Sequence, residues 1–572
     1  MAERVKQHPT ALNAAERSAA AGIDAAAQQS YGAVVVGAGP AGMHLAAQLS
    51  QRKIKTLLIE RGRFLETEKT FALPKNIVER YRLESAVNAC HDDTYFRSYF
   101  GLNFPADIDY CIMDQKKTLS RIANGIDASY CTIIENCELT AFSRTHGGIS
   151  AKTVVNDYRC VRYREALRRF PRALSRLDVD EGFFEKHNPF VYVNAMDELD
   201  NLDKSRANPA FTASLLVDAG GFHSCLNRSF HRQRTCAVWK CLVYEFDRMP
   251  VPQPEIIWDQ AIPTATNANF WVDVSSPRSA GVGVMVLTQS TPDRPEAQPS
   301  SQEMESYMST WLNIRRLSGT FVRERKGYIP MADFTEPAAY DNVLFIGASA
   351  TRQIPDTGFG FAPALEEAEL AAPVIAEALR RSDTSVRMLR NYDIAWLRSC
   401  EQKMALNKFL QGFHFAVTRD EYFHEFAARC AELPDNIIQR RLSNDLTTGD
   451  LAAVARMFLK HPYLLHPSRL SPGRMPELKR DLARFIYCLI SQVLHFYVPE
   501  GSSMFDNQPP CGSAAPRMIS ALRSFLFRRF PERLFGIIGS CIFNPGVQAI
   551  LAGFKPHQKT SGAQGANRAN KR

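Results

Sequence analysis

Apolar and polar residues near the N-terminal end of the chain predict three elements around one glycine-rich turn. The apolar run Ala33 to Val36 leads into Gly37-Ala38-Gly39-Pro40-Ala41-Gly42, and residues 43–50 have the pattern of a helix. A second apolar run, Thr56 to Ile59, ends on Glu60. This order of strand, glycine turn, helix, strand and acid is typical of a βαβ unit that binds a dinucleotide. The alternative is an ordinary βαβ unit with a glycine turn.

Each residue of the turn has a physical task in the dinucleotide interpretation. Gly37 allows the tight turn out of the strand, Gly39 lets a pyrophosphate approach the backbone, and Gly42 lets the helix pack closely on the strand. The free N–H groups at the helix start attract phosphate oxygens, and Glu60 can accept hydrogen bonds from a ribose. The predicted contacts of this part of the cofactor are Gly37, Gly39, Ala41, Gly42, Glu60 and Arg61.

The middle of the chain predicts a mixture of helices and strands. Residues 72–100 are expected to be mostly helical, and the charged stretch 159–210 is expected to be an insertion with a helix over 163–177. The sequence LLVDAGGFHS (215–224) predicts a strand that returns to the first sheet beside the cofactor. The other expected elements are helices over 114–126 and 302–317 and strands over 131–134, 138–143, 148–155, 241–246, 269–274 and 282–287.

A second informative stretch is DNVLFIGASATRQIPDTGFGFAPALEEA, residues 341–368. Val343 to Ile346 predicts a short buried strand that Gly347 closes, residues 355–360 predict a turn, and residues 361–379 have helical spacing. The start of such a helix can meet an anionic or electron-rich group of a bound cofactor. A plain strand–loop–helix connection is the alternative.

The C-terminal part of the chain is predicted to be helical. Apolar residues recur at helical spacing over 386–417, 420–431, 448–460 and 475–496. Residues 516–554 interleave arginines with Leu, Phe and Ile. Such a basic amphipathic stretch either makes a peripheral contact with an anionic membrane or packs as a helical cap on the other domains, and both hypotheses stay open.

The composition of the chain argues against several kinds of partner and site. The net charge of +9 is modest for 572 residues and there is no long Lys/Arg run, so no nucleic-acid partner is predicted. The thirteen cysteines form no CxxC pair and have no His or Cys partner at ligand spacing, which predicts no metal site and buried free thiols in a reducing compartment. The chain lacks a signal-peptide core and an apolar run long enough to span a membrane, so we expect a cytoplasmic location, with peripheral membrane contact left open.

The combination of three motifs resembles a known superfamily. The chain carries GxGxxG near its start, Asp-Ala-x-Gly-Phe-x-Ser in its middle and a late strand followed by Pro-x-Thr-Gly. This order is similar to that of the flavoproteins that include aromatic hydroxylases, geranylgeranyl reductases and lycopene cyclases. Within this group the segment GYIPMADFTEPAAYDNVLFIGASATRQIPDTGFGFA looks most like the lycopene cyclases. The resemblance runs from residue 31 to about 455.

This resemblance implies FAD as the cofactor and extends the predicted site. The GxGxxG glycines would face the pyrophosphate, and Gly347 and Ala348 would approach the phosphates. Four consecutive residues would lie near the flavin ring and its ribityl chain: Asp356, Thr357, Gly358 and Phe359. NADPH is a candidate electron donor, although it would bind without a Rossmann domain of its own.

One departure from the lycopene cyclases affects the predicted chemistry. That family carries a Phe-Leu-Glu-Glu-Thr-like run in its inserted domain, where acids act on the polyene. Met285 to Thr291 stands at the matching place and contains no carboxylate. A glutamine cannot exchange a proton in that role. Plain lycopene cyclisation is therefore disfavoured, while the FAD scaffold is unaffected.

Three functional hypotheses follow. The first is an FAD-dependent oxidoreductase, of monooxygenase or reductase type, that acts on a lipophilic polyene, isoprenoid or polyketide-like substrate in secondary metabolism. Its candidate catalytic residues are Asp356 and Arg352, with Gln353 nearby; Asp356 could instead cap the following helix, and His44 fits a hydrogen-bonded core residue better than a site residue. The second is a lycopene-cyclase-like cyclase or isomerase that uses reduced flavin without net redox. The third is an inactive FAD-fold protein that binds a lipid or a partner.

The predicted fold class is α/β. It combines a Rossmann-type FAD-binding domain with an inserted sheet-based substrate domain and a helical C-terminal region. The predicted segments are an N-terminal extension (1–30), three parts of the FAD-binding domain (31–158, 211–235 and 331–385), an insertion (159–210), a substrate domain (236–330), a helical C-terminal region (386–555) and a disordered tail (556–572).

Overall fold

The structure is a computed structural model of the whole chain. It describes residues 29–62, 65, 69–92, 94–97, 103–105, 108–135, 137–145, 148–155, 158–162, 190–195, 210–230, 237–249, 255–259, 268–276, 279–288, 299–331, 337–355, 358–417, 420–430 and 432–495. The predicted helix over 163–177, the basic segment 516–554 and the tail lie outside the described residues. The predicted domain boundaries stay a prediction.

A ten-stranded sheet forms the centre of the fold. The strands in the middle of this sheet are parallel, in the spatial order β8, β2, β1, β13 and β20. The antiparallel strands β10, β9 and β19 extend one edge, and β12 and β11 extend the other. The strands are β1 (Ser30–Val36), β2 (Thr56–Ile59), β8 (Cys131–Ile134), β9 (Cys137–Thr145), β10 (Gly148–Val155), β11 (Tyr158–Arg162), β12 (Phe190–Ala195), β13 (Ala210–Asp218), β19 (Ala339–Tyr340) and β20 (Val343–Phe345). This parallel order is that of a dinucleotide-binding sheet, which confirms the predicted fold class.

The late strand β13 pairs directly with β1, as predicted. Val35 lies opposite Val217 and Val36 opposite Asp218, so the carboxyl ends of both strands meet at one edge of the sheet. The four residues 215–218 are fully buried, as is typical of strands in the parallel part of such a sheet. The helices that belong to this part are α2 (Pro40–Gln51), α4 (Gln115–Ala123), α8 (Cys225–Ser229) and α10 (Phe361–Arg380).

A seven-stranded sheet forms a second layer. It contains the strands predicted over 241–246, 269–274 and 282–287, and α9 (Ser301–Arg315) packs on one face through Met304, Met308 and Trp311. A capping box at Ser300 and Glu303 starts this helix. In spatial order the strands are β18 (Thr320–Met331), β14 (Ala237–Asp247), β17 (Ser279–Thr288), β16 (Ala268–Ser276), β15 (Glu255–Asp259), β5 (Thr94–Arg97) and β6 (Asn103–Pro105).

The prediction of a mostly helical segment over 72–100 is wrong. This stretch contains only the short helix α3 (Lys75–Arg80) and the one-turn η1 (Glu84–Ala86), and the rest is mostly extended. Two of its strands flank β7 in a three-stranded sheet, formed by β3 (Thr70–Pro74), β7 (Tyr110–Asp114) and β4 (Val87–His91). The pairing with β7, which lies later in the sequence, overrides the local helical spacing.

The prediction of free thiols also needs a correction. Cys90 of β4 lies directly opposite Cys111 of β7, and the two form a disulfide with a Cα–Cα distance of 4.1 Å. Sequence spacing could not show this, because the register of two paired strands brings the residues together. Among the other described cysteines, seven are free, and five of these are buried: Cys131, Cys137, Cys241, Cys400 and Cys488.

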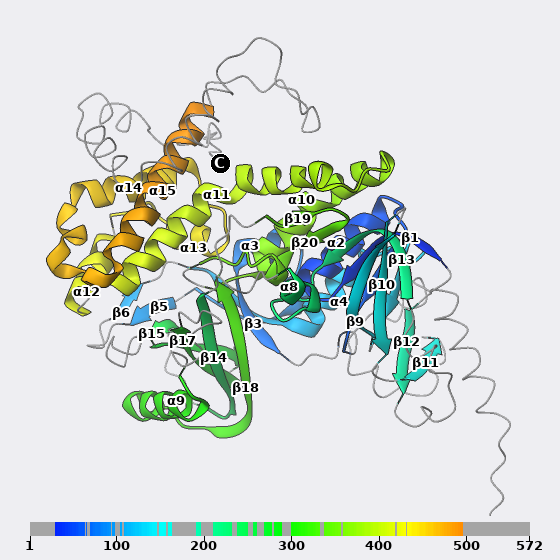
Figure 1. Ribbon diagram of the computed structural model, residues 1–572. Coiled ribbons are helices and arrows are strands. Elements are labelled where there is room, and N and C mark those ends of the chain that lie inside the picture. The colour runs from blue at the N-terminus through cyan, green and yellow to red at the C-terminus, as the bar shows by residue number, and fades with distance from the viewer. Residues whose placement is uncertain are drawn as a thin grey trace, which may run out of the picture.

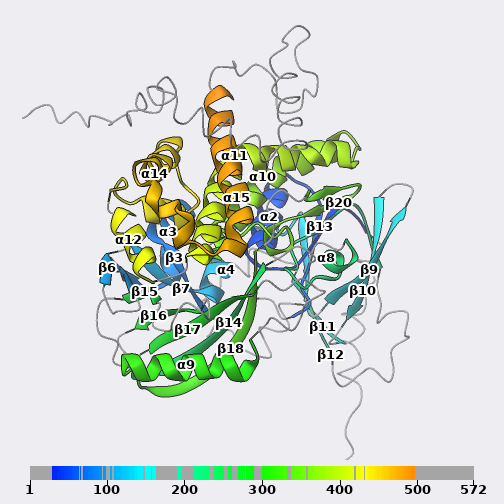
Figure 2. The same cartoon turned by 60° about the vertical axis from the view of Figure 1, so that its left-hand side comes forward.

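Helices after residue 385 pack around a second core. They are α11 (Val386–Ala416), α12 (Asp420–Cys430), α13 (Ile437–Leu442), α14 (Thr448–Lys460) and α15 (Met475–His495). Their shared core includes Trp396, Phe409, Phe413 and Phe458. In Figures 1 and 2 these helices and the large sheet occupy opposite sides of the molecule, while the seven-stranded sheet carries α9 on its outer face. Among the described residues, no helix is both long and apolar enough to cross a membrane.

The disulfide yields a stability prediction. Under non-reducing conditions, Cys90→Ser should lower the free energy of unfolding by about 3 kcal/mol, because the cross-link closes a loop of some twenty residues in the unfolded chain. Urea unfolding of the variant and of wild type with and without dithiothreitol measures this. Cys225→Ser, which removes a half-buried thiol that forms no disulfide, is the control and should have little effect. Equal stability of wild type in both conditions would contradict the prediction.

Candidate functional site

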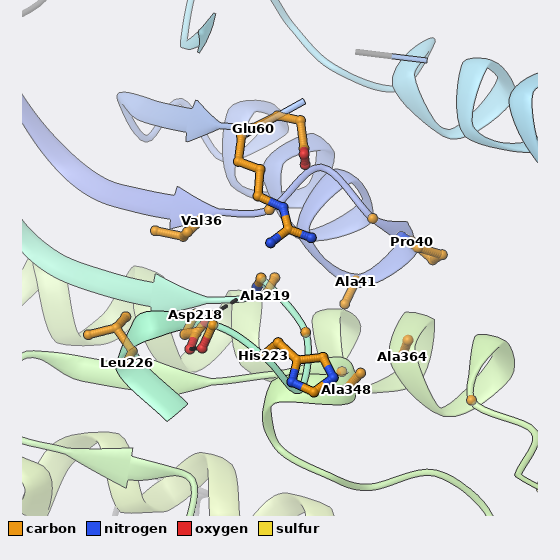
Figure 3. Close-up of a pocket in the computed structure, with 18 of the residues that line it drawn as sticks. Val36, Pro40, Ala41, Glu60, Asp218, Ala219, His223, Leu226, Ala348 and Ala364 are labelled. Carbon is orange, nitrogen blue, oxygen red and sulfur yellow. Dashed lines mark hydrogen bonds between the residues drawn. The ribbon is translucent and has the colours of Figure 1, made fainter. Parts of the chain in front are cut away.

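A cleft opens where the carboxyl ends of β1 and β13 meet. It has a volume of about 620 Å³, within the range of small-molecule sites. In Figure 3, Pro40 and Ala41 of α2 lie on one side of it, and His223, Ala348 and Ala364 lie on the other. β1 has β2 on one side and β13 on the other, so the order of the strands reverses at β1. Open α/β sheets bind ligands at such a topological switch point.

The three glycines of the turn meet different surroundings. A Cβ on Gly42 would lie 1.9 Å from the carbonyl oxygen of Gly37, and one on Gly37, whose φ is +96°, would lie 2.5 Å from the carbonyl oxygen of Ala219. A Cβ on Gly39 would meet nothing within 4 Å, because Gly39 faces the cleft. Gly37 and Gly42 therefore hold backbone segments together, and Gly39 leaves space for a ligand. These residues fit the pyrophosphate of a dinucleotide.

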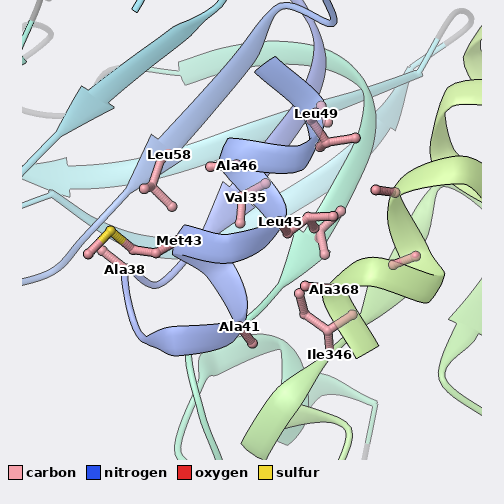
Figure 4. Close-up of a cluster of buried hydrophobic side chains, with 14 of the residues drawn as sticks. Val35, Ala38, Ala41, Met43, Leu45, Ala46, Leu49, Leu58, Ile346 and Ala368 are labelled. Atoms are coloured by element: carbon pink, nitrogen blue, oxygen red, sulfur yellow. The ribbon is translucent and has the colours of Figure 1, made fainter. Parts of the chain in front are cut away.

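Small side chains hold α2 in this position. Figure 4 shows Leu45 and Ala46 packed between the strands and the neighbouring helix, with Ala41 facing Ile346 and Ala368. Because these contacts are buried and close, the start of α2 is fixed relative to the turn that follows β20.

Glu60 braces the glycine turn. Its Oε2 accepts a hydrogen bond from the N–H of Ala38 at 2.7 Å, and its Oε1 accepts one from the N–H of Gly62 at 3.0 Å. Glu60 and Arg61 both line the cleft, as predicted. Each carboxylate oxygen retains acceptor capacity, so binding of a ribose hydroxyl remains compatible with these bonds.

An acid that was not among the predicted site residues organises the opposite wall. Asp218 is fully buried at the end of β13, and its carboxylate accepts hydrogen bonds from the N–H of Gly220 at 2.8 Å and the hydroxyl of Ser224 at 2.5 Å. Ser349 donates a third at 3.1 Å. This network fixes the loop that carries His223 into the cleft. The sequence signal was the motif DAGGFHS, which predicted a strand and supported the family resemblance but was not used to name a site residue.

The turn after β20 also reaches the cleft. Gly347 and Ala348 line it, as predicted, and Gly347 has a φ of +63°. The N–H of Gly347, however, donates to Glu367 of α10 at 3.0 Å, on the side away from the cleft. Gly347 therefore offers a ligand its small size rather than a hydrogen bond.

Not every predicted residue lies in the cleft. Asp356 and Thr357 lie outside the described residues. Gly42 packs under the cleft rather than on its surface, and Phe359 packs against the helical core. Gly358 lies against the seven-stranded sheet, where a Cβ would be 3.1 Å from Ile329.

The structure places Arg352 away from the cleft. This residue is 2% exposed, its Nη2 donates to Asp393 at 2.6 Å, and its guanidinium lies 5.0 Å from the ring centres of both Tyr392 and Trp396. It therefore points into the protein and does not line the cleft. Its neighbour Gln353 does line the cleft. His44 contacts Glu369 at 3.3 Å within the helical packing, in keeping with a core role.

Near Gly358 the inner face of the seven-stranded sheet is apolar. Trp239, Cys241 and Met285 are buried there, and Trp271 and Ile329 pack against them. Trp271 lies over Gly283, and its Nε1 donates to Asp273 at 2.9 Å, which fixes the orientation of the indole. This face offers an apolar wall beside the loop that the sequence assigned to the flavin.

The cysteines of the cleft are not arranged for redox chemistry. Burial raises the pKa of the Cys137 thiol to about 12, so it stays protonated at neutral pH and is a poor nucleophile. Cys225, the other cysteine that lines the cleft, is not bonded to it. Within the described ranges, no group of three or more His, Cys, Asp or Glu side chains is placed to hold a metal.

Comparisons with known proteins agree with this geometry. The family model described as lycopene cyclase protein matches residues 293–466, and the one described as an NAD(P)-binding Rossmann-like domain matches residues 35–95. A geranylgeranyl bacteriochlorophyll reductase-like protein from Thermoplasma acidophilum superimposes with a TM-score of 0.53 at 16% identity, over 76% of this chain and 99% of its own. A flavin-dependent brominase gives 0.52 at 13% identity, over the same shares. The chain has the fold of this flavoprotein superfamily. The predicted resemblance is confirmed.

Two curated relatives of this chain are named as reductases. The digeranylgeranylglycerophospholipid reductase 1 of Methanococcoides burtonii is 21% identical over 157 residues, which are 27% of this chain and 36% of the relative. The corresponding enzyme of Methanothrix thermoacetophila is 24% identical over 27% of this chain and 34% of its own. The chain thus spans about a third of the length of these relatives.

The glycine geometry yields a matched pair of predictions. Gly42→Ala should lower the free energy of unfolding by about 1–3 kcal/mol, because the new methyl group overlaps the Gly37 carbonyl. Gly39→Ala should cost less than about 1 kcal/mol, since its methyl group enters open space at a helix start. Urea unfolding of both variants without cofactor measures this difference.

The same two variants distinguish an effect on stability from an effect on cofactor binding. Gly39→Ala should weaken FAD binding by about tenfold or more, because the methyl group occupies the path of the pyrophosphate. Equilibrium dialysis against FAD measures this effect. Wild-type affinity in Gly39→Ala would show that the cofactor does not approach this residue.

Proposed function

We propose that the chain is an FAD-dependent oxidoreductase of reductase type that acts on a lipophilic isoprenoid substrate. The observation that carries the proposal is the open space at Gly39 in the cleft between β1 and β13, whereas a Cβ on either of the other two glycines of the turn would overlap backbone atoms. FAD would lie along this cleft, with its pyrophosphate at Gly39 and its ribose at Glu60. When bound, FAD supplies the two-electron chemistry.

The residues of the chain supply binding, orientation and exclusion of water. The network around Asp218 holds the loop with His223 and Ser224 at the cleft, and Gln353 and Ala364 also line it. The wall of Trp239, Met285 and Ile329 gives an apolar substrate a surface next to Gly358. Burial of such a substrate against these side chains is favourable in proportion to the apolar area removed from water.

The acids of the inner sheet face favour redox chemistry over acid-catalysed cyclisation. Glu245 forms ion pairs with Arg323 and Arg325, and Asp273 accepts a hydrogen bond from Trp271. β17 has no carboxylate from Met285 to its end at Thr288. Among the described residues of this face, the acids are therefore engaged, whereas cyclisation needs an acid free to protonate the polyene.

The reductase type is supported by the names of the curated relatives, which reduce geranylgeranyl groups. The lycopene cyclase match over 293–466 supports a second candidate, a cyclase or isomerase that uses reduced flavin without net redox. A place in secondary metabolism, NADPH as the donor and membrane contact through 516–554 stay predictions.

The proposed function predicts the mass of the product. Purified protein reconstituted with FAD should show visible flavin bands that bleach with NADPH or dithionite under nitrogen. Incubation with geranylgeranyl diphosphate or lycopene, followed by mass spectrometry, should then give a product that has gained two hydrogens for each double bond reduced.

Other results would redirect or refute the proposal. A gain of one oxygen atom in air would identify a monooxygenase, and an unchanged mass with a changed retention time would identify the cyclase. Gly39→Ala is the matched control and should lose both the flavin bands and the product. Failure of wild type to retain FAD after reconstitution would overturn the assignment.

A further inference from the structure

The long helix α11 lies directly behind two turns that face the cleft. These are the turn Gly347–Ser349 and the segment 352–355, which contribute Gly347, Ala348 and Gln353 to the lining. Three residues of one stretch of α11, Tyr392, Asp393 and Trp396, contact this region, and a fourth, Gln411, contacts it about five turns further on.

The first contact reaches Gly347 through Glu367. Tyr392 donates its hydroxyl proton to Oε2 of Glu367 at 2.7 Å, and the same oxygen accepts the N–H of Gly347 at 3.0 Å. Tyr392 and Glu367 are both fully buried. Burial and the adjacent Glu367 carboxylate hold the pKa of Tyr392 well above its usual value, so the phenol remains a donor. The position of Gly347 is therefore set by a side chain of α11.

The second contact holds Arg352. Its guanidinium is sandwiched by Tyr392 and Trp396 and bonded to Asp393, whose carboxylate also accepts the N–H groups of Ala338 and Ala339. Within the described part of the chain, Nε and Nη1 of Arg352 have no hydrogen-bond partner. The cation is therefore held mainly by one carboxylate and two aromatic faces.

The backbone at Thr351, next to Arg352, is strained, and the buried contacts of Arg352 help to maintain this conformation. Thr351 has a φ of +59°, which is rare for a β-branched residue, and it is 1% exposed. Strained residues persist where the surrounding structure over-determines them. The buried contacts of Arg352 thus fix the direction in which Gln353 enters the cleft.

The third contact holds the other end of the segment. Gln411, which is 3% exposed, donates its Nε2 proton to the carbonyl oxygen of Pro355, and its Oε1 accepts a proton from Lys408 at 3.0 Å. The segment 352–355 is therefore fixed to α11 at both ends, by a charge at one and by an amide at the other.

We propose that Arg352 and Gln411 are positioning residues for the flavin end of the bound cofactor, acting through the cleft-facing residue Gln353, which lies between their two points of attachment. The proposal rests on the proposed function, because it requires bound FAD. It makes the helical C-terminal region part of the cofactor site, although none of its side chains lines the described cleft.

Charge gives the proposal a distinctive signature. Arg352→Met would leave Asp393 as an uncompensated buried anion behind the cleft, which disfavours the electron-rich reduced flavin. Asp393→Asn would leave Arg352 as an uncompensated cation, which favours it. The midpoint potential of the bound flavin should therefore become more negative in the first variant and more positive in the second. Arg352→Lys, which keeps the charge, should lie between Arg352→Met and wild type.

The amide contact gives an independent test with a matched control on the same helix. Gln411→Met removes the donor to Pro355 and should weaken FAD binding about tenfold. Gln402→Met makes the same chemical change at a buried residue that, in the described structure, has no hydrogen bond to the segment 352–355, and should leave the affinity within about threefold. Fluorescence titration of the full chain with FAD measures both, and redox titration of the loaded protein measures the potentials.

The outcomes separate the two proposals. Potential shifts in one direction for both charge variants, or no shift, would overturn the positioning role, as would equal affinities of Gln411→Met and Gln402→Met. If Arg352→Met does not fold, the glutamine pair decides. A wild-type chain that binds no FAD would refute the proposed function itself, whereas wild-type binding with unchanged variants would refute only the inference.

Discussion

The parallel pairing of β13 with β1 is the constraint on which the site depends. The two strands are separated by more than 170 residues, yet their register places Asp218 next to Val36 at the edge from which the glycine turn starts. Without this pairing, the turn would face no opposite wall. The intervening chain forms the three-stranded sheet and contributes β5 and β6 to the seven-stranded sheet. Its return to the first sheet as β13 creates the cleft.

Carboxylates hold the turns around the cleft by accepting hydrogen bonds from backbone N–H groups. Glu60, Asp218, Glu367 and Asp393 each accept at least one backbone N–H from a turn or short strand near the ends of the parallel strands. Such turns have N–H groups that no ladder or helix satisfies, and an unsatisfied buried N–H costs free energy. Glu367 and Asp393 fix their turns from behind the cleft, whereas Glu60 and Asp218 line it beside small residues such as Gly39 and Ala348.

The sequence predicted the parts of the fold that depend on local patterns. The βαβ unit, β8, β10, β13, α9 and the long helices all lie where periodicity and glycine placement put them. The cleft residues Gly37, Gly39, Glu60 and Gly347 followed from the same motifs. Features that depend on distant partners were missed: β3 and β4 form because β7 pairs with them, and Cys90 meets Cys111 through that register. The surroundings of Arg352 could not be predicted for the same reason, since only the tertiary position of Tyr392, Asp393 and Trp396 shows that its charge is engaged.

Helix α11 also limits which substitutions related sequences can tolerate. It is 31 residues long, which corresponds to about 46 Å, and it connects the core of the helical region with the turns behind the cleft. If α11 is rigid, a change in its tilt moves both the helical core and the turns behind the cleft. Substitutions at 352 and 393, whose side chains form an ion pair, are therefore tolerated best when they occur together. In related sequences these positions should vary as a pair, and the helical region should be inherited with the nucleotide-binding sheet rather than exchanged as a module.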